Sequence, residues 1–342
     1  MGAPETPTRE FVIGLPKAEL HVHLEGTLEP ALKLELAQRN GVEIGQTTIA
    51  EVEATYQFDS LTSFLLVYYP AMEVLVEEQD FYELAHAYLQ RAAADGVRHV
   101  EMFFDPQAHT SRGVPFEAVV TGYHRAAEAG ASLGIDADLI MCFVRDHSAE
   151  SAAETLEASI PFKDWIVGVG LDSDERGNPP EKFAEVFARA REHGYRLTMH
   201  CDIDQIGSID NIRTVMHDIR TERIDHGTNI VEDPSLVEEL RAAGIGLTCC
   251  PVSNRFVTND MKAKEISDLL RAGVRVTVNS DDPAYFGGYV ADNYLALAEQ
   301  AELTGAEVVT LAENSFLISW VDEDRRAGYL DEIGRYVDGF AP

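Results

Sequence analysis

The 342-residue sequence predicts an α/β fold, a (β/α)8 TIM barrel, from three observations. Short β-branched or apolar runs alternate with helix-like segments along the chain, which is the pattern of parallel βαβ units. There are eight such runs, and eight βαβ units can close into a barrel. No glycine-rich turn follows the first run, and this disfavours an open, doubly wound sheet.

The expected strands are short, and polar residues gather near their carboxyl ends. They lie at residues 18–24, 97–106, 136–144, 165–172, 195–202, 223–229, 245–254 and 275–283. Expected helices between them include residues 115–134, 180–194 and 234–244. Several of these segments end at a glycine, the residue that most readily closes a helix in the left-handed conformation. These glycines are Gly134, Gly194, Gly244 and Gly273.

Two regions add helices to the basic barrel. Residues 25–96 form a long insertion after the first strand, and its many aromatic side chains favour packing of extra helices in the core over a lid on a pocket. Residues from about 291 onward are expected to form terminal helices on the barrel exterior. No Gly/Ser-rich or Pro-rich linker interrupts the chain, so we expect a single domain over residues 1–342.

Composition limits the class of protein. The 59 acidic against 27 basic residues give a formal net charge of -32, which argues against a nucleic-acid partner because such binding depends on Lys and Arg. The apolar runs are too short for a membrane span, and the N-terminus lacks a signal-peptide layout. The four cysteines show no metal-binding spacing. We therefore expect a cytoplasmic protein with reduced thiols, no membrane partner and a small-molecule substrate; a homo-oligomer is compatible with the sequence.

A metal site is predicted at the carboxyl ends of the strands, where barrel enzymes place their active sites. His21 and His23 are separated by one residue in a strand, so both point to the same face, into the barrel. His200 ends the fifth strand and Asp281 ends the eighth. Three imidazoles and one carboxylate suit zinc better than magnesium or calcium, and a polarised water would complete the shell.

Two further residues are candidates for the chemistry. His226 ends the sixth strand, either as a structural histidine or as a base beside the activated water, and the second role fits the predicted metal site better. Asp282 follows the ligand Asp281, and adjacent residues leaving a strand point apart, so its carboxylate could meet a substrate. A turn role before Pro283 is the competing interpretation.

The runs LPKAELHVHLEGTLEP, RIDHGTN and NSDDPAYF resemble those of the adenosine and adenine deaminases of the amidohydrolase superfamily, over residues 15–320. MFFDPQAHT, GLDSDERGNPP and DDPAYFGGY are most similar to the bacterial and fungal adenine deaminases. The resemblance implies one zinc ion per chain on a distorted barrel and hydrolysis of a 6-aminopurine at C6, releasing ammonia. It implies that His226 activates water and that Asp282 binds N7. It also implies that Ser173, in LDSDE, offers a backbone amide to the ring, and we expect Asp172 beside it to be a substrate-binding residue as well.

The resemblance also bears on the substrate. Adenosine deaminases have an Asp that meets the ribose where this chain, like the adenine deaminases, has Glu25. One more methylene would carry the carboxylate into the sugar subsite, so adenine is the expected substrate and hypoxanthine the product. Adenosine is an alternative.

The chain departs from the family pattern after the third zinc histidine. The family has Ala-Gly-Glu there, and the Glu protonates N1; this chain reads HCDIDQ, with Ile203 at the Glu position. Asp202 or Asp204 could supply the proton instead, and we favour Asp204 slightly because a loop residue can be re-aimed more easily. A shorter acid leaves room for an N6-substituted adenine, which is a second substrate hypothesis.

Other functions fit less well. Binuclear amidohydrolases use a carboxylated lysine at the end of the fourth strand, which lacks one here. A cytidine-deaminase-like site needs His-x-Glu and Pro-Cys-x-x-Cys, and neither is present. A catalytically impaired purine-binding protein on the same scaffold is the remaining alternative, prompted by the missing Glu, but the retained open metal site argues against it.

Overall fold

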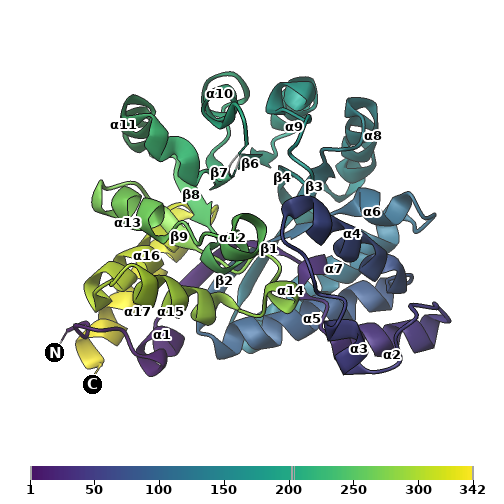
Figure 1. The fold of residues 1–342 in the computed structure, drawn as a ribbon, viewed down its shortest axis with the longest axis horizontal. Coiled ribbons are helices and arrows are strands. Elements are labelled where there is room, and N and C mark those ends of the chain that lie inside the picture. Colours follow the sequence, from purple (N-terminus) through teal and green to yellow (C-terminus); the bar gives the residue numbers. More distant parts are fainter. Residues whose placement is uncertain (1, 202, 204, 341–342) are drawn as a thin grey trace.

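Eight parallel strands form the centre of the fold in the computed structural model, which describes residues 2–201, 203 and 205–340. The strands follow one another in chain order within two sheets, and helices surround them (Figure 1). The fifth barrel strand consists of two short pieces, β5 and β6. The bounds are β1 (Lys17–His23), β2 (Val97–Phe104), β3 (Asp136–Val144), β4 (Ile166–Asp172), β5 (Arg196–Leu197), β6 (His200–Cys201), β7 (Arg223–His226), β8 (Gly246–Cys249) and β9 (Val276–Val278).

Two junctions join these sheets into a barrel. Between β5 and β6 the backbone N–H of Thr198 donates to the carbonyl of Val169 on β4 at 3.0 Å. At the other junction, the His23 N–H donates to the Asp281 carbonyl at 2.9 Å, and the Asp281 N–H donates to the His21 carbonyl at 3.1 Å. The predicted barrel is therefore confirmed, and its ladder is irregular next to residues of the predicted site.

Helices cover the barrel and extend it as the sequence predicted, with the insertion after β1 forming several of them. Gly134 and Gly244 end helical segments with φ of 75° and 71°, a conformation that disfavours any residue with a Cβ. No helix within the described ranges is both long and apolar enough to cross a membrane. The insertion forms α2 (Pro30–Asn40), α3 (Ile49–Glu53), α4 (Leu61–Ala71) and α5 (Glu78–Ala94). The others are α1 (Arg9–Gly14), α6 (Pro106–Thr110), α7 (Phe116–Gly130), α8 (Ala149–Ser159), α9 (Ala184–Glu192), α10 (Ser208–Arg213), α11 (Pro234–Ala243), α12 (Pro251–Thr258), α13 (Ala263–Arg271), α14 (Pro283–Phe286), α15 (Val290–Gln300), α16 (Gly305–Leu317) and α17 (Glu323–Gly339).

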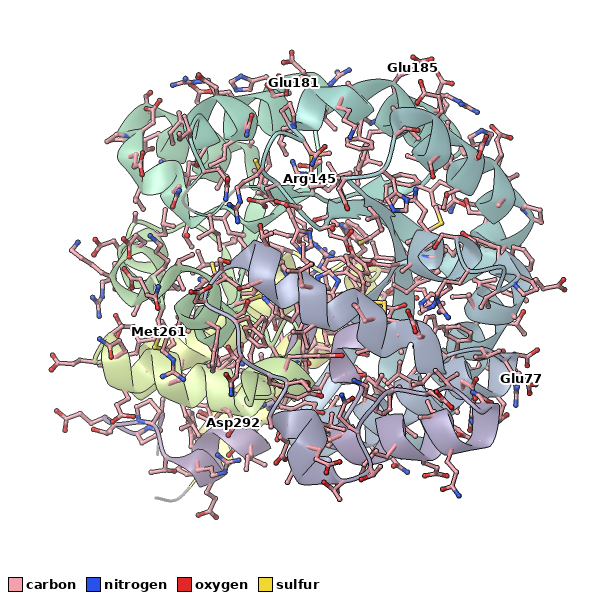
Figure 2. The ribbon with its side chains drawn as sticks, turned by 45° about the vertical axis from the view of Figure 1, so that its right-hand side comes forward. Glu77, Arg145, Glu181, Glu185, Met261 and Asp292 are labelled. Atoms are coloured by element: carbon pink, nitrogen blue, oxygen red, sulfur yellow. The ribbon has the colours of Figure 1, made fainter. Side chains whose placement is uncertain are left out.

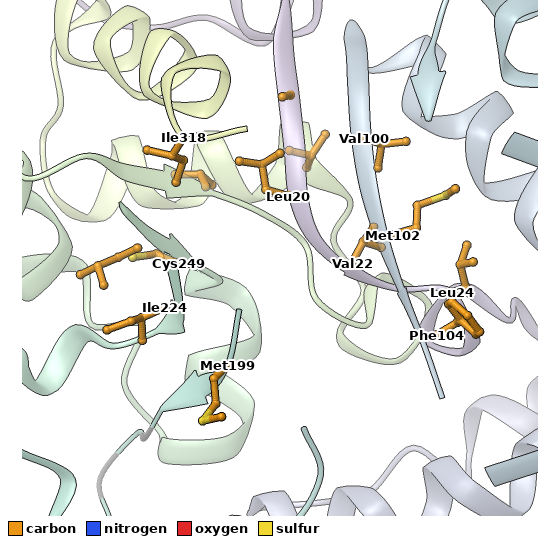
Figure 3. Packing of buried hydrophobic residues seen from close by; sticks show 14 of the residues in the cluster. Leu20, Val22, Leu24, Val100, Met102, Phe104, Met199, Ile224, Cys249 and Ile318 are labelled. Atoms are coloured by element: carbon orange, nitrogen blue, oxygen red, sulfur yellow. The ribbon is translucent and has the colours of Figure 1, made fainter. Parts of the chain in front are cut away.

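The alternation of β1 separates the core from the site. Leu20 and Val22 belong to the buried hydrophobic cluster, with Val100 of β2 and Ile224 of β7 (Figure 3). The intervening residues of a strand point to its other face. On β1 that face carries histidine side chains into the barrel, where the ring of His21 packs against the ring of Phe103 at a centroid distance of 5.1 Å. A strand with both faces buried can therefore still carry polar chemistry.

A buried polar network fills the barrel at the amino end of its strands. Arg223 forms an ion pair with Glu101, and its guanidinium lies 4.1 Å from the ring centroid of Trp320. The same Trp320 ring packs so closely on Gly168 of β4 that a Cβ there would lie 2.4 Å from a ring carbon. These groups close that end of the barrel, so a ligand enters from the carboxyl end.

Candidate active site

A cavity of about 500 Å³ lies at the carboxyl ends of the strands. His23, His200, His226 and Asp281 line it together with Asp282. Each belongs to a different strand end or the loop after it, except for the adjacent aspartates. The barrel therefore brings together residues that are far apart in the sequence, as the sequence analysis expected.

The four predicted metal ligands converge with spacings that suit zinc. Nε2 of His23 lies 3.2 Å from Nε2 of His200. Oδ1 of Asp281 lies 3.3 Å from Nε2 of His21 and 3.4 Å from Nε2 of His23. Zinc–ligand distances of about 2.0–2.1 Å in a tetrahedron place the ligand atoms roughly 3.3 Å apart. These three spacings match that value, and His21, His200, His226 and Asp281 also have ligand atoms within 4.8 Å of one another. The cluster therefore fits a zinc ion, with His226 beside the four predicted ligands.

Hydrogen bonding leaves the imidazoles ready for a cation. Nε2 of His21 is buried and has no hydrogen-bond partner among the described residues. Burial lowers the pKa of His200 well below its usual range and also lowers that of His23, whereas the Asp281 carboxylate outweighs burial and raises the pKa of His21. Burial lowers the pKa of the adjoining His226 to about 3. Neutral imidazole is the form that binds metals, so His23 and His200 are in that form, and His21 shares a proton with Asp281 until a cation replaces it.

Two of these residues adopt unusual backbone conformations. His226 and Asp281 have φ of 61° and 64°, in the left-handed region that non-glycine residues seldom occupy. Nε2 of His226 lies 3.7 Å from Oδ2 of Asp281, so His226 adjoins the four-residue cluster. Strain of this kind gathers at functional sites, where the surrounding structure maintains it.

A second layer of side chains orients the ligands, and sequence reasoning missed it. The hydroxyl of Thr248 on β8 lies 2.9 Å from Nδ1 of His21 and donates to Asp225 at 2.8 Å. The hydroxyl of Thr198 donates to the other oxygen of Asp225 at 2.7 Å. That oxygen also lies 3.7 Å from Nδ1 of His200. Asp225 thus connects two of the candidate ligands through one buried carboxylate.

Arg145, immediately after β3, also supports the site and was not identified from the sequence. Its side chain points into the molecule, whereas Glu181 and Glu185 lie at the periphery (Figure 2). It donates from Nη1 to the carbonyl of His200 at 2.9 Å and from Nε to the carbonyl of Asn178 at 2.9 Å. Arg145 therefore ties the end of β6 to the loop after β4.

Asp282 lines the same cavity as its neighbour Asp281. It begins α14 without a side-chain cap bond and is buried. Its Oδ1 lies so close to Gly26 that a Cβ there would be 2.0 Å from it. Burial, together with the Asp281 carboxylate, raises the pKa of Asp282 well above its usual range. A protonated carboxyl group facing the cavity can donate a hydrogen bond to a ring nitrogen.

Asp172 and Ser173 both line the cavity at the end of β4. Oδ2 of Asp172 lies 3.5 Å from Nδ1 of His23, so Asp172 contacts a candidate ligand as well as the cavity. Ser173 has φ of 76°, which bends the backbone sharply at the strand end. Both residues therefore stand where the family resemblance expected contacts with a ligand.

Glu25 is not where the sequence analysis expected its carboxylate to be. It is fully buried and is not among the residues that line the cavity. Its Oε1 accepts hydrogen bonds from Tyr123 and His109, each at 2.9 Å. These partners lie on α7 and α6, and they hold the longer side chain away from the cavity. Glu25 can therefore affect a sugar subsite only indirectly, through the residues that its carboxylate holds in place.

Helix α4 of the insertion forms part of the cavity wall. Phe64 and Tyr68 belong to the buried hydrophobic core and Tyr69 packs against it, as expected for the aromatics of the insertion, and all three also line the cavity. Phe64 also packs against Phe286, with ring centroids 4.9 Å apart. The same side chains thus serve the core and the pocket, because α4 packs across the carboxyl end of the barrel.

The proton-donor region is described in part. Ile203 and Gln205 line the cavity. Asp202 and Asp204, the two predicted acids, lie outside the described residues. Ile203 stands where the family has its proton-donating Glu, and an isoleucine side chain carries no ionisable proton. Because Ile203 lines the cavity, this departure from the family pattern lies at the cavity itself.

Comparisons with known proteins agree with this geometry. The model of the adenosine deaminase family matches residues 16–336. An adenine deaminase from Acinetobacter baylyi is 48% identical over 95% of this chain and 98% of its own length. The crystal structure of an adenine deaminase from Arthrobacter aurescens is similar, with a TM-score of 0.91 and 43% identity over 95% of this chain and all of that one. An amidohydrolase structure from Burkholderia ambifaria with bound Zn has a TM-score of 0.87 and 26% identity, over 99% of this chain and 97% of its own. The chain belongs to the adenosine deaminase family.

Proposed function

We propose that the protein catalyses the hydrolytic deamination of adenine, converting adenine and water to hypoxanthine and ammonia. The observation that carries the proposal is the convergence of three imidazoles and a carboxylate, with donor atoms 3.2–3.4 Å apart, at the mouth of the barrel. Relatives named adenine deaminases are 48% identical over nearly the whole chain, and this supports adenine as the substrate.

One zinc ion per chain is the proposed cofactor, held by His21, His23, His200 and Asp281. Bound there, zinc supplies the Lewis acidity that makes water a nucleophile near neutral pH. Asp225, through Thr248, keeps the donor nitrogen of His21 directed at the cluster. Four buried cysteines without disulfides support a cytoplasmic location, where thiols stay reduced.

The remaining steps belong to side chains around the cluster. His226, with its neutral imidazole beside Asp281, orients the attacking water and accepts its proton. Asp282 donates to N7 of the purine, and the Ser173 amide contacts the ring. Asp172 orients His23 from its outer nitrogen.

Proton delivery to N1 is assigned to Asp204, with Asp202 as the alternative. Asp204→Asn is expected to lower kcat on the order of 10²-fold if that carboxyl delivers the proton. Asp202→Asn is the matched control, because it removes the same charge two residues away. Normal turnover in Asp204→Asn beside an inactive Asp202→Asn would transfer the role to Asp202.

N6-substituted adenines are a second candidate substrate class, favoured by the apolar wall near Ile203. Leu61, Leu65, Val257 and Phe286 also line the cavity. A volume of about 500 Å³ lies in the range of pockets for drug-sized ligands, so the cavity has space beyond a bare purine. An alkyl group on N6 would contact apolar side chains where the family pattern has a glutamate.

The deciding experiment compares kcat/KM for adenine, adenosine and N6-methyladenine on zinc-loaded protein, with detection of ammonia or methylamine. We expect adenine to be the best substrate. A higher value for N6-methyladenine would move the assignment to the second class, and a clearly higher value for adenosine would overturn the free-base proposal. One zinc per chain with no product from any aminopurine would instead indicate a purine-binding protein.

A further inference from the structure

Asp105 is a buried carboxyl group in the cavity wall to which the reaction above gives no part. It follows β2, is 1% exposed and lines the cavity. It occupies the first position before α6, yet its side chain makes no cap hydrogen bond. Its Oδ1 is buried and has no hydrogen-bond partner among the described residues. An unsatisfied buried polar atom is costly, so it indicates a partner that a ligand brings.

The position of Asp105 relative to the metal cluster defines which part of a substrate it can meet. Asp105, Asp172 and His23 have polar atoms within 4.8 Å of one another. Asp172 contacts the outer nitrogen of His23, on the side away from the cluster. On its other flank, the backbone N–H of Asp105 donates to Glu25 at 3.4 Å. Asp105 therefore lies farther along the cavity wall, next to the residue at the family's sugar-contacting position.

Among the described residues, the charged groups nearest to Asp105 include no cation. Its nearest charged neighbours, Asp172, Glu25 and Asp282, are themselves carboxyl groups. Arg176 is the only Lys or Arg among the described residues that line the cavity, and its side chain is 57% exposed. A wall of carboxyl groups favours a ligand that presents an N–H group and carries no anionic group.

We propose that Asp105 accepts the N9–H of the purine and is a specificity-determining residue for the free base. The proposal rests on the adenine deaminase function proposed above. When C6 lies at the metal cluster and N7 at Asp282, the N9 edge is directed away from the cluster, along the wall that Asp105 occupies. Free adenine carries a hydrogen at N9, whereas a nucleoside carries a sugar there. Asp105 thereby stabilises bound free adenine through this hydrogen bond. When N9 is substituted, the buried carboxyl group of Asp105 stays without a partner and binding is weaker.

Adenine and 9-methyladenine separate this contact from all others, because they differ only at N9. A site built around such a hydrogen bond rejects an analogue that lacks it by about 10⁴-fold or more in kcat/KM. In Asp105→Ala we expect kcat/KM for adenine to fall on the order of 10²-fold, with little loss for 9-methyladenine, so that the ratio falls by the same factor. Asp105→Asn keeps an acceptor oxygen and is expected to retain the ratio within about tenfold.

Asp138→Ala is the matched control. It removes a carboxylate from β3 outside the cavity and is expected to leave the ratio unchanged. Equal losses for both substrates in Asp105→Ala would overturn the proposal and indicate a structural role. Two zinc ions per chain, falling to one in Asp105→Ala, would overturn it in favour of a second cation site with His23 and Asp172.

A binding measurement keeps the proposal distinct from the proposed function. Calorimetric titration of hypoxanthine and 9-methylhypoxanthine requires no turnover. If the unmodified protein releases no ammonia from adenine, the deaminase function fails. Preference for hypoxanthine over its 9-methyl derivative, lost in Asp105→Ala, supports the Asp105 contact in either case. The same affinity for both ligands in the unmodified protein would refute it.

Discussion

Replacing Thr248 by valine removes one hydroxyl group and tests how the protein sets the metal ligands. Asp225, when ionised, can only accept hydrogen bonds, so the single Thr248 hydroxyl proton points to it at 2.8 Å. The hydroxyl oxygen of Thr248 must then accept the N–H at Nδ1 of His21, at 2.9 Å. This fixes the tautomer of His21 and leaves the lone pair of Nε2 facing Asp281. Valine has a similar shape and breaks both links.

The expected loss is in metal affinity. Outer partners of ligating histidines typically contribute 10- to 100-fold to metal binding. Because the Thr248 hydroxyl contacts Nδ1 of His21 and is one of two hydroxyl donors to Asp225, we expect the zinc Kd to rise by that factor, about 1.4–2.8 kcal/mol. Thr248→Ser keeps the hydroxyl and should bind zinc within about threefold of the unmodified protein.

Competition with a fluorescent zinc chelator measures this Kd directly and does not depend on turnover. Thr277→Val is the control, because Thr277 is buried on the neighbouring strand β9 and its hydroxyl bonds to Asn279 rather than to a candidate ligand. It should leave the Kd unchanged. Thr248→Val with the affinity of the unmodified protein, or an equal loss in Thr277→Val, would refute the proposed orientation of His21.

Two further predictions concern stability and substrate binding. Hydrogen bonds to Asp136 and Glu101 outweigh burial and raise the pKa of His99 to about 9, above the value of about 6.5 for an unfolded chain. The native state then holds the extra proton, so its contribution is complete below pH 6.5 and is lost as the pH rises to 9, about 3 kcal/mol by linkage. Urea unfolding at pH 6 to 9 should show this decline, and His99→Gln should flatten it; an equally steep decline in His99→Gln would contradict the assignment. The second prediction concerns Asp282. Asp282→Ala should lower kcat/KM for adenine on the order of 10²-fold, whereas Asp282→Asn keeps a hydrogen-bond donor and should stay within about tenfold of the unmodified protein. Equal losses of kcat/KM in steady-state assays of both variants would exclude a donor role for Asp282.

Local pattern was sufficient to predict the barrel and the polar side chains that converge at its carboxyl end. Alternation along β1 placed His21 and His23 on one face, and the structure brings both to Asp281 within 3.4 Å. The ends of apolar runs identified His200 and His226 in the same way. Such inferences succeed because strand alternation and the common edge of parallel strands are properties of the backbone.

Contacts between distant elements could not be predicted in this way. In the sequence, Thr248 and Arg145 look like ordinary strand and loop residues. Their importance appears only in the fold, where the Thr248 hydroxyl contacts His21 and the Arg145 side chain donates to the carbonyl of His200. Glu25 was expected in the cavity because the family resemblance and one more methylene pointed to the sugar subsite, but Tyr123 and His109, about 90 positions away, determine where its carboxylate points. Side-chain direction after a strand end depends on partners that one sequence does not identify.

The most direct test of the account is ammonia release from adenine by protein of known metal content. We predict one zinc per chain, formation of hypoxanthine and ammonia in equal amounts, loss of activity on chelation and its return with zinc. A protein that binds one zinc per chain and releases no ammonia from adenine would contradict the central claim.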